Sequence, residues 1–187
     1  QKLFGWFLNV YIEIFRGTPM IVQSMVIYYG SAQAFGISID RTIAAIFIVS
    51  INTGAYMSEI VRGGIFAVDK GQFEAATALG MTHGQTMRKI VLPQVIRNIL
   101  PATGNEFVIN IKDTSVLNVI SVVELYFSGN TIATQTYKYF QTFTIIAVIY
   151  FVLTFTITRI LRYVEHRFDT DSYTTGANQM QTGELKP

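Results

Sequence analysis

Apolar residues recur at helical spacing in the first stretch of the chain. A helix over residues 1–16 has one apolar side, formed by Leu3, Phe7, Val10 and Ile14. Glu13 and Arg16 fall on its more polar side, and we expect these two side chains to form an ion pair with each other. The Gly-Thr-Pro sequence at residues 17–19 then interrupts the pattern. The sequence therefore predicts an amphipathic helix followed by a break.

Three long runs without a charged residue are typical of membrane-spanning helices. Residues 17–39 carry no charge over a length that as a helix crosses about 30 Å of hydrocarbon. Residues 42–58 are also uncharged, and their first half is strongly apolar. Residues 139–158 form the most apolar run, in which Ile, Val and Phe dominate. We expect each of these runs to cross a membrane.

Residues 93–113 combine apolar and polar positions, and their hydropathy alone does not predict a membrane helix. Glu106, Asn110 and Asp113 lie four and three residues apart, which places them on one helix face. Such a helix crosses a membrane only if its polar face is buried in protein or lines a cavity.

The last two polar regions of the chain have different patterns. Residues 114–138 contain two short apolar stretches and a turn signal at Ser128–Asn130, which predict re-entrant or surface-lying helices. Residues 169–187 are rich in Gly, Thr and Gln and are expected to form a mobile, polar tail.

The composition supports an integral membrane protein. Hydrophobic residues make up 50% of the 187 residues and charged residues only 14%, against about 25% charged residues in a typical soluble domain. The net charge of +2 is too small to argue for nucleic-acid binding. The chain has no cysteine, and its two histidines, His83 and His166, lie too far apart in the sequence for a two-histidine metal motif. Without a Gly-Lys pair or a Gly-x-Ser-x-Gly sequence, it has neither a P-loop nor a nucleophile elbow.

Basic residues predict the orientation, because Lys and Arg near membrane ends collect on the cytoplasmic side. They are concentrated in the loop over residues 62–92 and in a collar after the last apolar run, namely Arg62, Lys70, Arg88, Lys89, Arg159, Arg162 and Arg167. We therefore place this loop and the C-terminus in the cytoplasm, which requires an even number of crossings between them. The helix over residues 139–158 supplies one crossing, so residues 93–113 must supply another. The expected total is four spans.

Polar residues inside the predicted spans are candidates for a substrate path. Asn52, Tyr56 and Glu59 share one helix face, and ionisable residues within a membrane usually face a bundle interior or a watery cavity. The full candidate set is Gln23, Ser24, Asn52, Tyr56, Glu59, Glu106 and Asn110. Two other interpretations stay open: these groups join helices by hydrogen bonds of about 0.6 kcal/mol each, or Glu59 is solvated at the membrane edge. Paired carboxylates also leave an intramembrane enzyme as an alternative.

Residues 74–93 (EAATALGMTHGQTMRKIVLP) predict a short docking helix on the cytoplasmic side. Its alanines give a helix a low profile, so another protein can approach its backbone closely. Glu74 in the first turn is favourable with the helix dipole, Gly80 suits the left-handed end of a helix, and Pro93 suits the start of the next one. The alternative is an ordinary surface helix.

The spacing within this stretch resembles the signature of the membrane permeases of bacterial binding-protein-dependent ABC transporters. The matching positions are Glu74, Ala75, Ala76, Gly80, Ile90, Leu92 and Pro93. Further stretches resemble the polar amino-acid uptake branch of that family, namely Tyr11–Pro19, Arg62–Ile65, Gly71–Ala76, Lys112–Ser115 and Val119–Leu125. The resemblance covers about residues 10–168.

The resemblance implies a permease domain over residues 1–168, followed by the polar cytoplasmic tail. The family core is an all-α bundle of about five membrane helices, of which four are evident here, so we expect the first family helix to be missing from this sequence. The signature stretch is a coupling helix that docks into a separate ATPase subunit. That partner binds ATP and Mg²⁺ and hydrolyses the nucleotide, while this chain holds no cofactor and is not itself an enzyme.

The expected function is therefore the permease subunit of an ATP-driven importer of polar amino acids in the bacterial inner membrane. The implied partners are the ATPase, a second identical or related permease subunit, and an extracytoplasmic substrate-binding protein. Besides the enzyme, the open alternative is a membrane scaffold or sensor that docks an ATPase and transports nothing.

Overall fold

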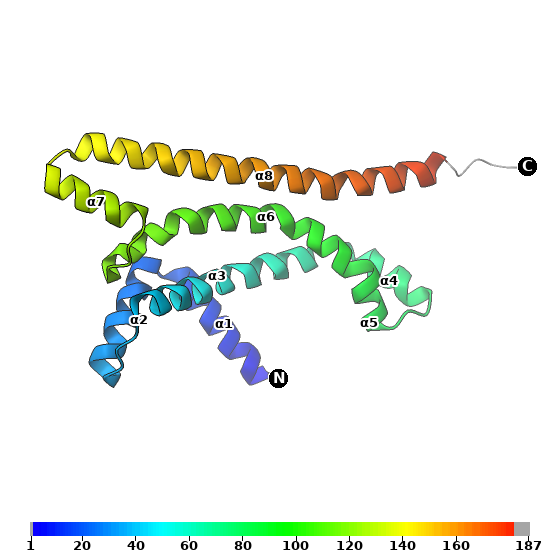
Figure 1. Cartoon of the computed structure of the whole chain (residues 1–187). Coiled ribbons are helices and arrows are strands. Elements are labelled where there is room, and N and C mark those ends of the chain that lie inside the picture. The colour runs from blue at the N-terminus through cyan, green and yellow to red at the C-terminus, as the bar shows by residue number, and fades with distance from the viewer. Residues whose placement is uncertain (1, 182–187) are drawn as a thin grey trace, which may run out of the picture. The chain divides into compact units, whose positions relative to one another are not determined.

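Helices account for every regular element in the part of the chain that the computed structural model describes, which is the backbone of residues 2–181 and the side chains of residues 3–167 (Figure 1). In order they are α1 (Lys2–Gly17), α2 (Met20–Phe35), α3 (Arg41–Phe66), α4 (Lys70–Ala78), α5 (His83–Thr86), a π-helical segment (Met87–Val91), α6 (Leu92–Asp113), a 3-10 segment (Thr114–Ile120), α7 (Leu125–Thr136) and α8 (Tyr139–Gln181). The structure thus confirms the all-α fold class and the helix predicted over residues 1–16.

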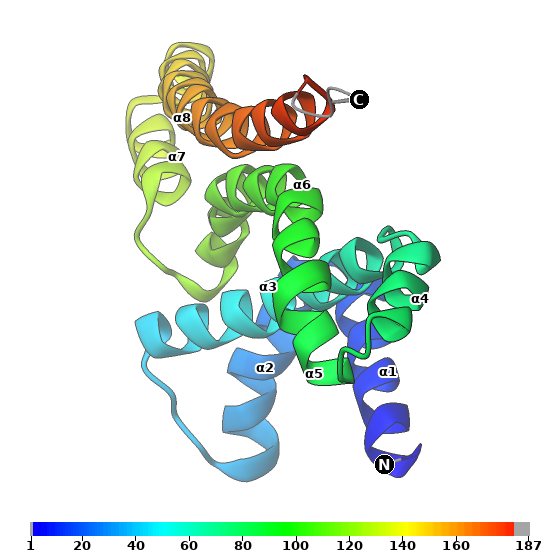
Figure 2. The same cartoon turned by 90° about the vertical axis from the view of Figure 1, so that its right-hand side faces the viewer.

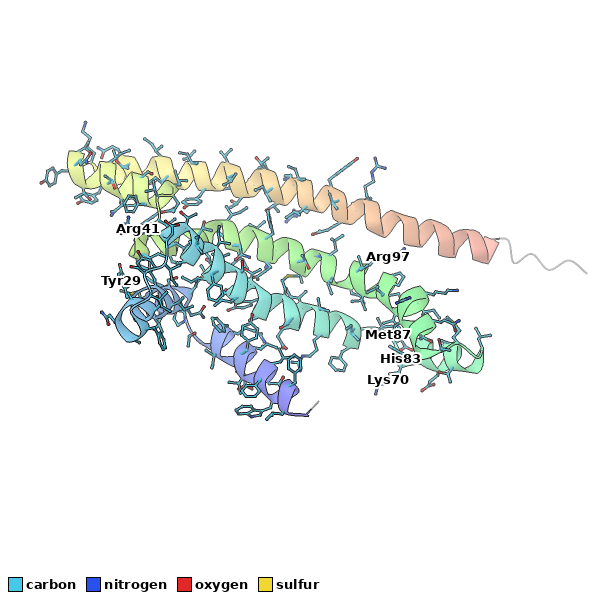
Figure 3. All side chains as sticks on the ribbon, turned by 60° about the horizontal axis from the view of Figure 1, so that its bottom comes forward. Tyr29, Arg41, Lys70, His83, Met87 and Arg97 are labelled. Atoms are coloured by element: carbon cyan, nitrogen blue, oxygen red, sulfur yellow. The ribbon has the colours of Figure 1, made fainter. Side chains whose placement is uncertain are left out.

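The chain separates into two compact units, each with its own packing. The first unit comprises residues 1–59 and 105–155, and the second comprises residues 60–104 and 156–187. The buried cluster of the first unit consists of Ala44, Ala45, Ile48, Leu117 and Ile120. In the same unit Tyr29 of α2, labelled in Figure 3, donates a hydrogen bond of 3.0 Å to the carbonyl of Val119. The 3-10 segment is therefore tied to α2 by polar as well as apolar contacts.

Two of the described helices are long and apolar enough to cross a membrane. They are α3 and the first part of α8, over Tyr139–Arg167. A third span results only if His83–Ile120 and Leu125–Thr136, which meet at a bend of 54°, count as one broken span or re-entrant loop. The structure thus has two or three candidate spans in its described part, fewer than the four that the sequence predicts.

The difference in the number of spans comes mainly from α2. This helix has 16 residues, or about 24 Å at 1.5 Å per residue, which is shorter than the hydrocarbon layer. It begins after Pro19 and ends at Gly36, whose φ of 66° is left-handed and stops the helix. The uncharged run over residues 17–39 therefore does not form one continuous helix, and α2 covers only its middle part.

The turn predicted at Ser128–Asn130 is wrong, because these residues lie inside α7. The helix starts at Leu125 and is capped by Glu124, whose carboxylate accepts hydrogen bonds from the backbone N–H groups of Tyr126 and Phe127 at 2.7 and 2.5 Å. A side chain on Gly129 would collide with Ile146 of α8. The glycine therefore serves close packing of two helices, which a local turn signal does not distinguish.

The backbone of α8 stays helical to Gln181, well beyond the expected end of the last span at residue 158. The predicted tail over residues 169–187 thus falls partly in this helix, and residues 182–187 lie outside the described residues. The mobility expected of the tail stays a prediction.

Candidate functional site

An ion pair joins α1 to α3 in the first unit. The Arg16 guanidinium lies 3.0 Å from the Glu59 carboxylate, measured between Nη1 and Oε2. The same guanidinium lies 5.7 Å from the centre of the Tyr56 ring, within the range of a cation–π contact. The expected pair between Glu13 and Arg16 is replaced by this contact, because α1 packs against α3 and brings a carboxylate from a distant part of the chain to Arg16. Arg16, which is not among the candidate path residues, thus contacts two of them, Tyr56 and Glu59.

A second polar contact in this unit joins α2 to α3. Asn52 donates from Nδ2 to Oε1 of Gln23 at 3.0 Å, and both side chains are buried. Gln23 in turn donates from Nε2 to the backbone carbonyls of Phe15 and Thr18, each at 2.9 Å. These amides satisfy the carbonyls that the break at the end of α1 leaves without a helical partner. Inter-helix hydrogen bonding, one of the interpretations left open, is therefore one role of Gln23 and Asn52.

Close contact between α1 and α3 explains a glycine in the same region. The Tyr11 hydroxyl donates a hydrogen bond to the carbonyl of Ile51. A Cβ on Gly54 would lie 3.0 Å from that hydroxyl oxygen, so a larger residue at this position would push α1 away. Sequence patterns missed Tyr11, because its partner lies 40 residues further along the chain.

The remaining path candidates lie on α2 and α6. Ser24 is fully buried and donates to the carbonyl of Met20 in its own helix at 2.8 Å. Asn110 accepts a hydrogen bond of 3.1 Å from Thr53 of α3 through its Oδ1 atom. Glu106 is only 8% exposed, and no described residue hydrogen-bonds or ion-pairs to its carboxylate. Glu106 is thus a buried acid of this unit whose hydrogen-bonding capacity the described residues leave unused.

The signature stretch forms a helix and a tight turn in the second unit. The side chain of Asp69 caps α4 by accepting the N–H of Gly71 at 2.7 Å, and the helix closes with Met81 N–H donating to the carbonyl of Ala76 at 3.0 Å. Gly80 has a φ of +73°, which confirms the left-handed end predicted for it. Glu74 lies in the second turn rather than the first, because α4 begins at Lys70 and Asp69 occupies the capping position.

The sequence predicts that the next helix starts at Pro93, but the helix begins ten residues earlier, at His83. Thr82 and Gln85 form a reciprocal capping box that starts α5, and the helical path continues through the π-helical segment into α6. Leu92 donates its N–H to the carbonyl of Met87, five residues back. Pro93 thus lies within a continuous helical run and does not start it. A proline in an α-helix clashes with the preceding turn and lacks the N–H that would donate to it. The wider π turn directly before Pro93 makes room for the ring and lessens both effects.

In the second unit α4 lies beside the start of this long helix (Figure 2), and an apolar cluster holds the two together. Its buried members are Val68, Val91 and Val95, and it is completed by Ile65, Phe73, Met87 and Ile99. Figure 3 labels Lys70, His83 and Met87, which come from α4, α5 and the π-helical segment. Because Phe73 directly precedes Glu74 and packs into this cluster, the signature helix is anchored from its inner face.

The outer face of the signature stretch remains accessible. Ala76 is buried, whereas Glu74, Ala75, Gly80, Leu92 and Pro93 are exposed and Ile90 is half-buried. Leu79, at the tip of the turn, is 80% exposed. A single exposed apolar side chain is common and does not by itself mark a contact surface. Its place at the turn is visible in the sequence, since Leu79 directly precedes Gly80.

Comparison with known proteins places this geometry in a family. Residues 1–170 match the family described as binding-protein-dependent transport system inner membrane component. The chain belongs to this family. It is 39% identical over 168 residues to the arginine transport system permease protein ArtQ of Bacillus subtilis (strain 168), covering 90% of this chain and 77% of the relative. It is 40% identical over 168 residues to the glutamine transport system permease protein GlnP of Escherichia coli (strain K12), covering 87% and 77%.

Solved structures agree with the family assignment. The permease matches the crystal structure of an amino acid ABC transporter with histidines, at 46% identity and a TM-score of 0.80, over 85% of this chain and 74% of the solved one. It matches the inward-facing MetNI methionine ABC transporter with a TM-score of 0.64 at 20% identity, over 83% and 73%, which supports the fold alone. The predicted resemblance and the predicted permease fold are both confirmed. The relatives are transport subunits, consistent with a non-enzymatic role for this permease.

Proposed function

We propose that this permease imports amino acids and that a separate ATPase subunit, which binds ATP and Mg²⁺, drives the import. The observation that carries the substrate class is the identity of 39–40% over 168 residues to permeases named for arginine and glutamine transport. The absence of a P-loop from the sequence supports a separate source of ATP hydrolysis.

The coupling surface is the outer face of the signature stretch, made of Glu74, Ala75, Gly80, Ile90, Leu92 and Pro93, with Ala76 packed beneath it. Small residues allow a partner to approach the α4 backbone, and Leu79 supplies an apolar anchor beside Gly80. The valine cluster behind α4 makes the surface rigid, so a displacement of α4 is passed directly to the helix that starts at His83.

The substrate path lies along the polar groups of the first unit, Gln23, Ser24, Asn52, Tyr56, Glu59, Glu106 and Asn110. Most of these groups are already hydrogen-bonded within the chain. No described residue hydrogen-bonds to Glu106, and a buried carboxylate in such a position favours a ligand that brings a positive charge. In this proposal Glu106 receives the ammonium group or a cationic side chain of the amino acid.

The assembly that this function requires contains a second permease subunit, identical or related, and an extracytoplasmic substrate-binding protein. It resides in the bacterial inner membrane with the turn around Gly80 and the C-terminus in the cytoplasm. Orientation is testable directly, because the chain has no cysteine of its own. Single cysteines at His83 and Lys138 are expected to react with a membrane-impermeant maleimide from the cytoplasmic and the outer side respectively; labelling from the reverse sides would contradict the topology.

Reconstituted transport tests the function as a whole. The permease, its cognate ATPase and its binding protein are placed in proteoliposomes, and uptake of radiolabelled arginine and glutamine is followed with and without ATP. ATP-dependent uptake of at least one amino acid is expected. ATP hydrolysis stimulated by the loaded binding protein without any uptake would instead support the scaffold or sensor, and a failure of the ATPase to co-purify would contradict the coupling surface.

A further inference from the structure

Arg16 makes the contacts that a free cationic ligand would make. Its guanidinium is held at 3.0 Å by the Glu59 carboxylate and at 5.7 Å by the Tyr56 ring. A carboxylate combined with an aromatic face is a recurrent way of recognising a guanidinium or ammonium group, since the first supplies charge and fork-shaped hydrogen bonding and the second supplies a cation–π contact. Both recognising groups stand on α3, one turn apart, whereas the cation comes from α1.

The site is open to exchange with a ligand. The side chain of Arg16 is 42% exposed and that of Glu59 is 21% exposed, so the ion pair is reached from solvent without unfolding either helix. Arg16 lies in the last turn of α1, next to the break at residues 17–19. An exposed ion pair contributes at most about 1 kcal/mol, so a free cation that makes the same contacts can displace this arginine.

The face of α3 that carries Tyr56 and Glu59 also contacts α2. Asn52 lies on the same face of α3 as Tyr56 and Glu59, seven residues and about 10 Å of helix before Glu59. It is oriented by its hydrogen bond to Gln23. The cation site itself therefore consists of the Glu59 carboxylate and the Tyr56 ring, and the buried Asn52 fixes the same face of α3 against α2.

We propose that Arg16 is a tethered competitor that occupies a cation site formed by Glu59 and Tyr56, and that a cationic amino acid, for which L-arginine is the probe, binds by taking its place. This inference rests on the proposed function and specifies one site on the path. Arg16 then makes the site selective for cationic over neutral amino acids, because a neutral side chain cannot replace the contacts that Arg16 makes with Glu59 and Tyr56.

The experiment measures binding to the detergent-purified complex of the permease and its ATPase, without the binding protein. Isothermal titration compares L-arginine with L-citrulline, a neutral analogue of nearly the same shape. Arg16→Ala is expected to bind arginine up to about five-fold more tightly than the unmodified protein, in keeping with the loss of one competing ion pair, and to leave citrulline affinity unchanged. The double variant Arg16→Ala/Glu59→Gln is expected to lose that gain.

Controls separate this proposal from a general change of charge. Arg41→Ala removes an arginine from the other end of α3 and is expected to leave both affinities unchanged. Arg16→Gln serves as the second test if Arg16→Ala does not purify as a folded complex, and the same gain is expected. An unchanged arginine affinity in these variants, an equal gain for citrulline, or a gain that survives Glu59→Gln would each overturn the proposal. Uptake by the unmodified transporter in proteoliposomes tests the import function separately, so the two failures are distinguishable.

Discussion

Each of the two units of this permease has its own characteristic internal contacts. The first unit has an apolar cluster around Ile48, and pairs of polar side chains also join its helices, as Arg16 joins Glu59 and Asn52 joins Gln23. In the second unit, an apolar cluster around Val91 joins α4 to the long helix. Polar contacts are directional and can be exchanged for contacts with a ligand, whereas close apolar packing is stiff and transmits displacement. The difference therefore supports the proposal that the substrate path lies in the first unit and the coupling surface in the second.

The largest effect is expected from Gly80→Val in the second unit. A left-handed backbone costs a residue with a side chain about 1–2 kcal/mol, and Gly80 has a φ of +73°, although a Cβ at this position would meet no other atom within 4 Å. The turn is then displaced, and we expect ATP-driven uptake to be abolished while the membrane helices stay folded. The measurement is uptake alongside ATP hydrolysis in proteoliposomes.

Gly84→Val is the matched control for this change. Gly84 also has open space around it but lacks a positive φ, so its substitution is expected to leave coupled uptake largely intact. Normal coupled uptake by Gly80→Val would show that the turn at Gly80 does not link ATP hydrolysis to transport. The coupling role proposed for the second unit would then be wrong.

The next largest effect is expected from Glu106→Gln in the first unit. If the buried carboxylate receives a cationic group, its neutral isostere loses a charged hydrogen bond of about 1.5–3 kcal/mol, or about 10–100-fold in arginine uptake. ATPase binding and basal hydrolysis should be unchanged, since Glu106 is not part of the coupling surface proposed above. Glu13→Gln, which neutralises an exposed carboxylate on α1, is the control. Undiminished arginine uptake would remove Glu106 from the path.

Much of this architecture could be predicted from local patterns. The helix over residues 1–16, the span within α3 and the apolar start of α8 follow from runs and periodicity, which survive into the folded state because membrane helices satisfy their own backbone. The turn at Gly80 follows from its place at the end of an alanine-rich helix. The signature can be recognised from the sequence because all its positions lie within 20 residues of one another.

The errors have one physical cause, which is competition between local and tertiary contacts. Arg16 has a local partner three residues away in Glu13, yet it pairs with Glu59 from another helix. Gly129 carries a turn signal, yet it serves the close approach of α7 to α8. Pro93 suits a helix start, yet the capping box at Thr82 starts the helix earlier and a π turn accommodates the proline. The capping box was visible in the sequence, whereas the other two outcomes depend on packing.

A smaller effect is expected from Val91→Ala, which tests the apolar cluster itself. Val91 has no exposed surface, so losing two methyl groups and leaving a cavity costs about 2 kcal/mol. We expect faster proteolysis at the turn after α4 and a lower ratio of uptake to ATP hydrolysed, without a change in arginine affinity. Val148→Ala, at an exposed position of α8, is the control, and equal proteolysis of the two variants would argue against a stiff second unit.

The smallest effect is expected from Thr53→Val, which deletes one polar link of the first unit while keeping the shape of the side chain. The hydroxyl donates to Asn110 at 3.1 Å, and such hydrogen bonds between membrane helices average about 0.6 kcal/mol. Thermal unfolding of the purified complex should therefore shift only slightly, less than for Val91→Ala. The comparison between the units predicts that Asn110, once released, is available to a ligand, so the balance between arginine and glutamine uptake should move more than the stability does. A large loss of stability with unchanged substrate preference would mean that the polar contacts of the first unit are structural, as the apolar ones of the second unit are.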